Sequence, residues 1–568
     1  MKKSLEKART YIPENLDMHW ETLMPIFQEL KDREIDSPEE LQRWLADRSE
    51  LEAALSEDFA WRYIRMTCNT NDEKFAEEFQ YFATEIEPKI APISNELDQK
   101  LIANPHLKSL EGDGYDIYIR KVETTLEIFR EENIPLFTEM QLKQQEYQRI
   151  AGELSVFIDG QELTLQQAGT LLLETNRSRR EEVWKSINEA RLAQKEAFEK
   201  IFDELLQLRH SVARNAGFAN YRDYMFAAMG RFDYSVEDCE AFHESVRKIV
   251  VPVLQEFAEE RKEKLQVPTL KPWDMAVDPD NLPPLKPFET GEELIDKTHK
   301  IFDHLHPYMG ECIRTMREKG LFDVESRLGK APGGYNYPLY ESGAPFIFMN
   351  AAGTVSDMTT MLHEGGHAIH TFISADLPLT EFKNLPSEVA ELASMSMELL
   401  SMEQWNVFMP NSDDLKRAKK EHLRDAIATL PWVATVDKFQ HWLYTHPEHT
   451  AEERAEAWLR IYREFGGGFA DWTNLEEAEK YLWHKQLHIF EVPFYYIEYG
   501  FAQLGAIAVW QNYLKNPTAG LDRYLAALKL GYTRTIPEIY AEAGVKFDFS
   551  TAYIQQLVDF LRQEVKNI

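Results

Sequence analysis

The sequence has few cysteines, fewer basic than acidic residues, and no long apolar run. Only Cys68, Cys239 and Cys312 occur among 568 residues, and their wide scatter predicts neither a disulfide framework nor a cysteine metal site. Lys and Arg number 63 against 96 Asp and Glu, which gives a formal net charge of -33. Nucleic acid and anionic membrane surfaces are therefore unexpected partners, because both need basic patches that displace counterions.

No stretch of the sequence suits a secretory leader or a membrane span. The first 20 residues begin with lysines but lack the apolar run of a signal peptide. The longest apolar-rich stretch, residues 501–510, is too short to cross a bilayer and contains Gln503. An apolar content of 44% indicates a globular chain. We expect a cytoplasmic protein without a membrane partner; no pattern sets its oligomeric state, and a monomer fits the composition.

Helical periodicity covers most of the chain. Apolar residues recur at intervals of three and four over residues 20–110 and 170–262, which predicts amphipathic helices. Residues 155–165 instead alternate around an Asp-Gly dipeptide, which predicts a short β-hairpin. We expect a mostly α protein with two lobes, an N-terminal helical lobe of residues 1–185 that includes the hairpin and a second lobe of residues 186–568.

A short apolar run, PFIFMN at residues 345–350, suits a β-strand. It directly precedes the motif described next. Two interpretations are equally weighted: an edge strand that pairs with an extended peptide by β-augmentation, or an ordinary buried strand.

The segment His363-Glu364-Gly365-Gly366-His367 matches H-E-x-x-H. Histidines four apart on a helix project from one face and can share one metal ion, while the glutamate points beside them at a metal-bound water. Hydrolytic zinc sites usually have three protein ligands and one open position, so a third ligand should follow. Spacing alone does not choose between Glu388 and Glu391, although an acidic residue in the first turn of a helix, as at Glu388, needs no functional explanation.

The two glycines of this motif lie inside a predicted helix. Gly365 and Gly366 together forfeit roughly 2 kcal/mol relative to alanine. We therefore expect another backbone, or a bound peptide, to approach the helix closely at these positions.

These motifs resemble those of the thimet-oligopeptidase superfamily of zinc peptidases, and more closely its oligoendopeptidase F branch. The resemblance rests on residues 363–370, on VAELASMSMEL at 389–399, and on RNAGFANYRDYMF at 214–226, with shorter matches over most of the chain. It implies a two-lobed helical zincin fold with a small β-sheet next to the H-E-x-x-H helix and a deep substrate channel. It also implies that residues 186–568 form the catalytic lobe.

The resemblance assigns roles to individual residues. It implies one Zn²⁺ per chain, held by His363, His367 and Glu391, with Glu398 orienting a ligand imidazole. His370 would then be structural, because the family uses only two histidines of this helix.

A tyrosine-rich segment, residues 483–502, resembles the family region that stabilises the oxyanion. The resemblance makes Tyr499 the principal donor, with Tyr496 on the same helical face and His488 as the histidine candidate. Which of His488, Tyr495, Tyr496 and Tyr499 act in this way stays open.

The function expected from these residues is zinc-dependent endopeptidase activity on short oligopeptides, not folded proteins. Glu364 would be the general base that activates the metal-bound water. One alternative is a zinc carboxypeptidase or dipeptidase, since the same metal site serves exopeptidases. Another is a helical binding protein with a structural metal.

Overall fold

Helices form most of the chain, as the periodicity predicts; the structure, a computed structural model, describes residues 9–568. The first twelve helices are α1 (Trp20–Asp32), α2 (Pro38–Cys68), α3 (Glu73–Tyr81), α4 (Glu87–Ala103), α5 (Tyr115–Ile128), α6 (Ile134–Gly152), α7 (Leu165–Thr170), α8 (Arg177–Ala193), α9 (Lys195–Asn215), α10 (Tyr221–Ala228), α11 (Val236–Leu265) and α12 (Gly291–Leu305). The remaining helices are α13 (Pro307–Glu318), α14 (Val355–Ser374), α15 (Thr380–Lys383), α16 (Ser387–Leu400), α17 (Ser412–Thr445), α18 (Ala451–Glu464), α19 (Glu476–Lys480), α20 (Leu487–Glu491), α21 (Ile497–Lys515), α22 (Pro517–Lys529), α23 (Ile536–Glu542) and α24 (Thr551–Asn567). None of the helices in this described range is long and apolar enough to cross a membrane.

The predicted hairpin is present. Strands β1 (Ser155–Ile158) and β2 (Gln161–Thr164) pair antiparallel. Asp159 and Gly160 connect them with φ angles of 54° and 78°, the left-handed conformation that a tight hairpin turn requires.

The second sheet has three strands in the order β3 (Phe322–Glu325), β5 (Phe346–Ala351) and β4 (Tyr335–Tyr337). Strand β5 runs parallel to β3 and antiparallel to β4, and its first four residues are buried. The edge-strand interpretation of PFIFMN is therefore wrong, and the buried-strand alternative holds. A nearly continuous apolar run is typical of a strand covered on both faces. The more polar strand β4 lies at the edge of the sheet.

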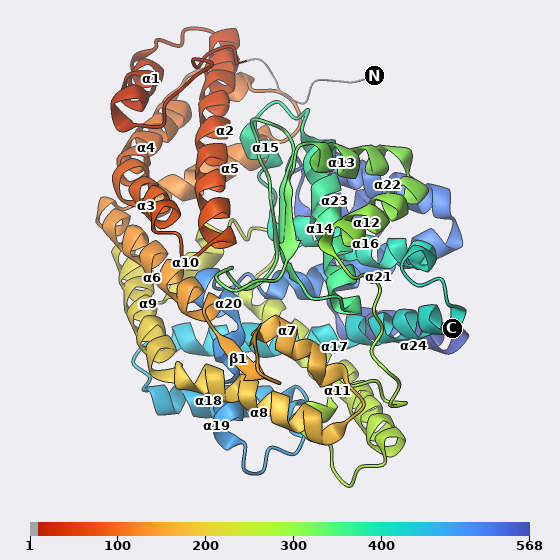
Figure 1. Cartoon of the computed structure of the whole chain (residues 1–568). Helices are drawn as coiled ribbons and strands as arrows, with labels where there is room; N and C mark the ends of the chain where they lie inside the picture. Colours follow the sequence, from red (N-terminus) through yellow and green to blue (C-terminus); the bar gives the residue numbers. More distant parts are fainter. Residues whose placement is uncertain (1–8) are drawn as a thin grey trace.

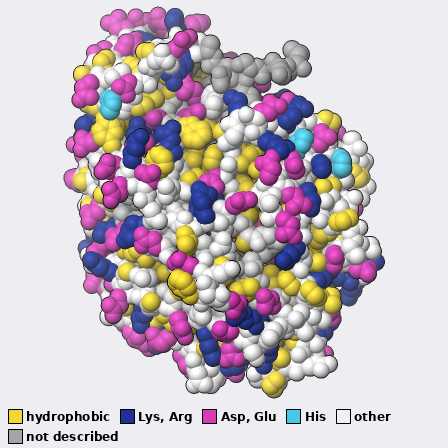
Figure 2. Space-filling model, in the orientation of Figure 1, with side chains coloured by type: hydrophobic (Ala, Val, Ile, Leu, Met, Phe, Trp, Pro, Cys, Tyr) yellow, Lys and Arg dark blue, Asp and Glu magenta, His cyan; other side chains and the backbone are white. Residues whose placement is uncertain are grey.

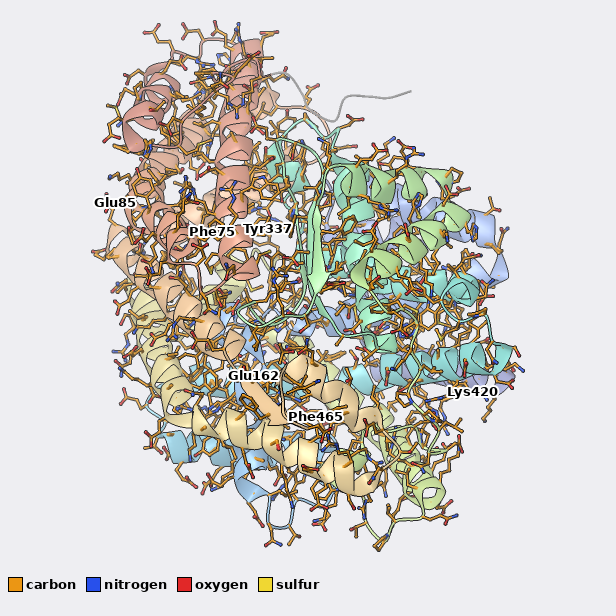
Figure 3. The ribbon with its side chains drawn as sticks, in the orientation of Figure 1. Phe75, Glu85, Glu162, Tyr337, Lys420 and Phe465 are labelled. Carbon is orange, nitrogen blue, oxygen red and sulfur yellow. The ribbon has the colours of Figure 1, made fainter. Side chains whose placement is uncertain are left out.

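The sheet lies between two groups of helices. In Figure 1, α1 to α5 stand at the upper left and α12, α13, α14 and α16 at the right, with the green strands between them and α15 on the α2 side of the strands. Tyr63 of α2 packs against Tyr335 and Tyr337 of β4, with ring centroids 5.6 and 5.8 Å apart. Tyr337 is labelled in Figure 3, between α2 and the sheet. Figure 2 shows hydrophobic side chains gathered where these two parts meet, while acidic and basic side chains are interspersed over the rest of this face.

The two glycines of the H-E-x-x-H motif let other helices approach α14 closely, α16 at Gly366 and α12 at Gly365. A Cβ atom on Gly366 would lie 2.6 Å from Cα of Ser394 and 2.9 Å from the carbonyl oxygen of Ala393, both in α16. A Cβ atom on Gly365 would lie 2.5 Å from the ring of Phe302 in α12. The structure therefore explains both glycines by close packing, with another backbone at Gly366 and an aromatic ring at Gly365.

We predict that Gly366→Ala lowers the midpoint of thermal unfolding. The added methyl group would push against the backbone of α16, and overpacking of this kind costs about 1–3 kcal/mol. Gly169→Ala is the matched control, because Gly169 is a helical residue of α7 whose Cβ position is open. The control should leave the midpoint unchanged or raise it, since alanine favours helix by up to about 1 kcal/mol. Equal midpoints for the two variants would contradict the close-packing account.

Candidate metal centre and active site

Helix α14 carries the H-E-x-x-H motif and begins directly after the central strand β5. Its N-cap, Thr354, accepts a hydrogen bond from the backbone N–H of Asp357, whose carboxylate in turn accepts one from the Thr354 N–H. This capping box satisfies two backbone donors that the first turn would otherwise leave unpaired. The start of the helix is thus fixed relative to the sheet, and His363 and His367 follow on the face toward α16.

The three residues predicted as metal ligands meet between α14 and α16. Nε2 of His363 lies 3.2 Å from Oε2 of Glu391, and Nε2 of His367 lies 3.6 Å from the same oxygen. One nitrogen or oxygen from each residue lies within 4.8 Å of the others. Two imidazole nitrogens and a carboxylate oxygen form a common ligand set for zinc in hydrolytic sites. We refer to His363, His367 and Glu391 as the triad.

Further side chains orient the triad. Oε1 of Glu398 lies 2.7 Å from Nδ1 of His363, so the second nitrogen of that ring is held by a carboxylate, as expected. The Tyr495 hydroxyl donates a 2.6 Å hydrogen bond to Oε1 of Glu391, which leaves Oε2 toward the histidines. The sequence made Tyr495 one of several possible oxyanion donors but did not predict its contact with Glu391, which spans 104 residues of chain.

The electrostatics of the triad favour a cation. Burial alone would raise the pKa of Glu391, but the imidazoles of His367 and His363 and the hydrogen bond from Tyr495 lower it to about 2. Burial acts to lower the pKa of His363, yet Glu391 and Glu398 raise it well above its usual value. Carboxylates on both sides of His363 therefore give the site a surplus of negative charge, which a divalent cation would offset.

Glu364 lies beside the triad in an environment that suits a proton acceptor. Its side chain is 5% exposed, and its Oε2 atom has no hydrogen-bond partner among the described residues. Burial raises the pKa of Glu364 to about 8, with Glu391 and Glu398 adding to the effect and His363 opposing it. Carboxylates with such raised pKa values occur at sites of general acid–base chemistry.

The aromatic candidates lie at different depths around the same site. Tyr499, in the first turn of α21, lines the triad cavity. His488 lies behind it, with Nε2 3.2 Å from the Tyr499 hydroxyl, and burial lowers the pKa of His488 to about 4. Tyr496 packs edge-on against the His488 ring, and its hydroxyl faces the polar groups of Trp432 and Gln486, which act to lower its pKa while burial raises it. The structure thus brings Tyr499 to the triad and holds Tyr496 farther out.

The triad opens into a cavity of about 280 Å³. Strand β4 and the loop after it form one wall, from Gly334 to Tyr340, and α14 forms another. Asn336 of β4 donates a 3.2 Å hydrogen bond to the backbone carbonyl of Glu364, which ties the edge strand to the motif helix. No sequence signal identified Asn336, because a single asparagine in a short strand has no distinctive spacing.

Two other residues that the sequence analysis considered, Glu388 as an alternative third ligand and His370 as a structural histidine, are not part of the triad. Glu388 is in the first turn of α16, as expected, but it is 3% exposed and accepts a hydrogen bond from the Tyr234 hydroxyl. A favourable interaction with the helix macrodipole therefore does not by itself explain why a buried glutamate occupies position 388. His370 is 1% exposed, and burial lowers its pKa to about 3, so its ring is neutral at physiological pH.

The residues present fit a zinc ion. The donor set is two imidazole nitrogens and one carboxylate oxygen, converging within 4.8 Å. Among the described residues, Oε2 of Glu364 has no hydrogen-bond partner, and Glu364 lines the same cavity as this donor set. The same arrangement, with an orienting carboxylate on a ligand histidine, is typical of zinc sites in proteins.

Comparison with known proteins identifies the family. The model of Peptidase family M3 matches residues 170–559, and that of the Peptidase M3 N-terminal domain matches residues 16–129. An oligoendopeptidase F homolog of Lactococcus lactis subsp. lactis is 25% identical over 58% of this chain and 53% of its own length. Oligopeptidase PepF of Bacillus subtilis is 22% identical over 63% of this chain and 54% of its own length. The chain thus aligns with only about half of the length of these curated relatives.

Solved structures are similar over nearly the whole chain. PZ peptidase A, solved with an inhibitor, has a TM-score of 0.92 and 28% sequence identity, and 99% of each chain is covered. A putative oligoendopeptidase F has a TM-score of 0.92 and 26% identity, covering 99% of this chain and 98% of the other. These matches confirm the mostly helical peptidase fold and the family resemblance that the motifs predicted. Because the two family models together match most of the sequence, the chain belongs to peptidase family M3.

Proposed function

We propose that this protein is a zinc-dependent endopeptidase that hydrolyses short peptides. The observation that carries the proposal is that the triad, Glu364 and Tyr499 converge on one cavity. A metal-ligand set, a proton acceptor and a hydrogen-bond donor are the three components that metal-assisted hydrolysis of an amide requires.

His363, His367 and Glu391 would hold the zinc ion, each fixed by its packing or hydrogen bonds. The chemistry that zinc supplies when bound to such ligands is polarisation of the scissile carbonyl and a lowered pKa for water. Glu364 would accept a proton from the attacking water, because its Oε2 atom has no other partner. The water oxygen then bonds to the carbonyl carbon, the C–N bond breaks, and Glu364 returns the proton to the amine nitrogen.

Tyr499 would donate a hydrogen bond to the carbonyl oxygen as negative charge develops on it. Burial raises the pKa of Tyr499 well above its usual value, with Glu391 and Tyr496 adding to the effect, so its hydroxyl keeps its proton. His488 contacts the same hydroxyl at 3.2 Å and would position it. In this proposal His488 acts through Tyr499, and Tyr496 supports the His488 ring.

Two cavities next to the H-E-x-x-H helix support internal cleavage over exopeptidase activity, because an endopeptidase must accommodate residues before and after the scissile bond. A second cavity, of about 420 Å³, is lined by Thr359, one helical turn before His363, and by Glu398. Strand β4 pairs only with β5 among the described residues, and its segment lines the triad cavity, so its free edge could bind an extended peptide by β-augmentation. Cavities of this size accommodate a few side chains at a time, which favours short peptides as substrates over folded proteins.

We predict internal cuts in peptides that are blocked at both ends. Acetylated and amidated peptides of about ten residues would be incubated with the protein, and the products identified by mass spectrometry. Cleavage should stop with a zinc chelator and return when zinc is added back. Cleavage only of peptides with a free carboxyl terminus would instead establish the carboxypeptidase alternative, and no zinc-dependent cleavage of either set would contradict the proposal.

We also predict that Tyr499→Phe lowers kcat by about 10²- to 10³-fold, the usual effect of removing one oxyanion donor. Tyr496→Phe is the matched control, since it removes the same atom from a hydroxyl that faces Trp432 and Gln486. Its effect on kcat should be much smaller. Steady-state kinetics on one blocked peptide would measure both variants, and equal losses would contradict the role given to Tyr499.

A further inference from the structure

A second group of metal-ligating side chains is buried between α11 and α17, apart from the triad. Cys239 and His243 lie one turn apart on α11, and Asp437 and His441 lie one turn apart on α17. Their exposures are 0%, 4%, 0% and 7%. We refer to these four residues as the α11–α17 cluster. None of them lines the triad cavity, and the mechanism above does not use them.

Hydrogen bonding within the protein does not satisfy this cluster. Nε2 of His243 lies 2.7 Å from Oδ2 of Asp437, which is an ordinary hydrogen bond. Among the described residues, the other oxygen of Asp437 and Nδ1 of His441 are buried without a hydrogen-bond partner, and Nε2 of His441 has only its ionic contact with Asp437. Buried polar atoms in folded proteins nearly always have partners, so several orphaned atoms in one place indicate a missing ligand.

The geometry matches that of the triad. Sγ of Cys239, a carboxylate oxygen of Asp437 and a ring nitrogen of His441 lie within 4.8 Å of one another. The distance from Nε2 of His441 to Oδ2 of Asp437 is 3.2 Å, equal to the distance from His363 to Glu391 in the triad. The pair lies within ion-pair distance but does not meet hydrogen-bond geometry, and both atoms could instead bind one metal ion.

We propose that the α11–α17 cluster is a second, structural metal site that binds Zn²⁺ through Cys239, Asp437 and His441. Sulfur, nitrogen and oxygen ligands at this spacing suit zinc, and binding would release the Cys239 proton to solvent. With a metal bound, the thiolate and the carboxylate would carry two negative charges, which a divalent ion would balance in this buried site. His243 would hold Asp437 in place by its hydrogen bond. The scatter of cysteines in the sequence gave no hint of this site, because only one cysteine takes part.

The site would stabilise the segment that reaches the triad. The His441 ring packs against Phe494, with ring centroids 5.4 Å apart, and the neighbouring Gln440 accepts a hydrogen bond from the Phe494 N–H. Phe494 has a φ of 69°, a conformation that non-glycine residues adopt only when their surroundings hold them there. The next residue, Tyr495, donates its hydroxyl hydrogen bond to Glu391. Metal binding between α11 and α17 would therefore help to fix Tyr495.

Metal analysis and cobalt substitution test this proposal. The full-length protein, purified without chelators, should contain two zinc equivalents per chain. After exchange with Co²⁺ it should show a thiolate-to-cobalt charge-transfer band in the near ultraviolet. Because no cysteine lines the triad cavity, that band reports on the α11–α17 cluster alone. Glu391→Gln should keep the band even if it loses metal from the triad.

Cys239→Ser should lose the band and one metal equivalent. Cys312→Ser is the matched control, since Cys312 is also buried but belongs to no metal-ligand group found among the described residues; it should keep both. Should Cys239→Ser fail to fold, His441→Gln and the unmodified protein remain informative. An unmodified protein without the thiolate band would overturn the proposal, whatever its activity.

Discussion

The close contact between α14 and α16 is the constraint on which the site depends. Gly366 lets the two backbones approach until a single methyl group would collide with Ser394. Only at this separation does a carboxylate on α16 reach both histidines of α14, at 3.2 and 3.6 Å. The helix propensity lost at Gly366, about 1 kcal/mol, is offset by packing that the third ligand requires.

Hydrogen bonds from distant segments of the chain then orient the triad and Glu364, which the contact between α14 and α16 brings together. Glu398 orients His363, Tyr495 orients Glu391, and Asn336 joins strand β4 to the backbone of Glu364. Each partner comes from a different part of the chain, so the ligand geometry depends on long-range packing. The segment around Tyr495 is itself held by α17, which connects the triad to the buried α11–α17 cluster.

Local sequence patterns predicted the helices, the hairpin and the H-E-x-x-H motif, because these depend on periodicity and spacing within a few residues. Local patterns did not suffice to predict the third ligand. Spacing allowed Glu388 as well as Glu391, and only the family resemblance favoured Glu391. Strand order was outside the reach of local patterns, so the central position of β5 was not predicted. The contacts of Tyr495 with Glu391 and of Cys239 with His441 join residues more than 100 positions apart. No local sequence pattern predicts such contacts.

The central claim is that Glu364 serves as the proton acceptor beside a metal held by the triad. The most direct measurement compares Glu364→Gln with the unmodified protein in bound zinc and in kcat on one blocked peptide. The substitution keeps the shape of the side chain and removes its basicity, so the account predicts unchanged zinc at the triad and a loss of about 10²- to 10⁴-fold in kcat. Full activity in this variant would contradict the account.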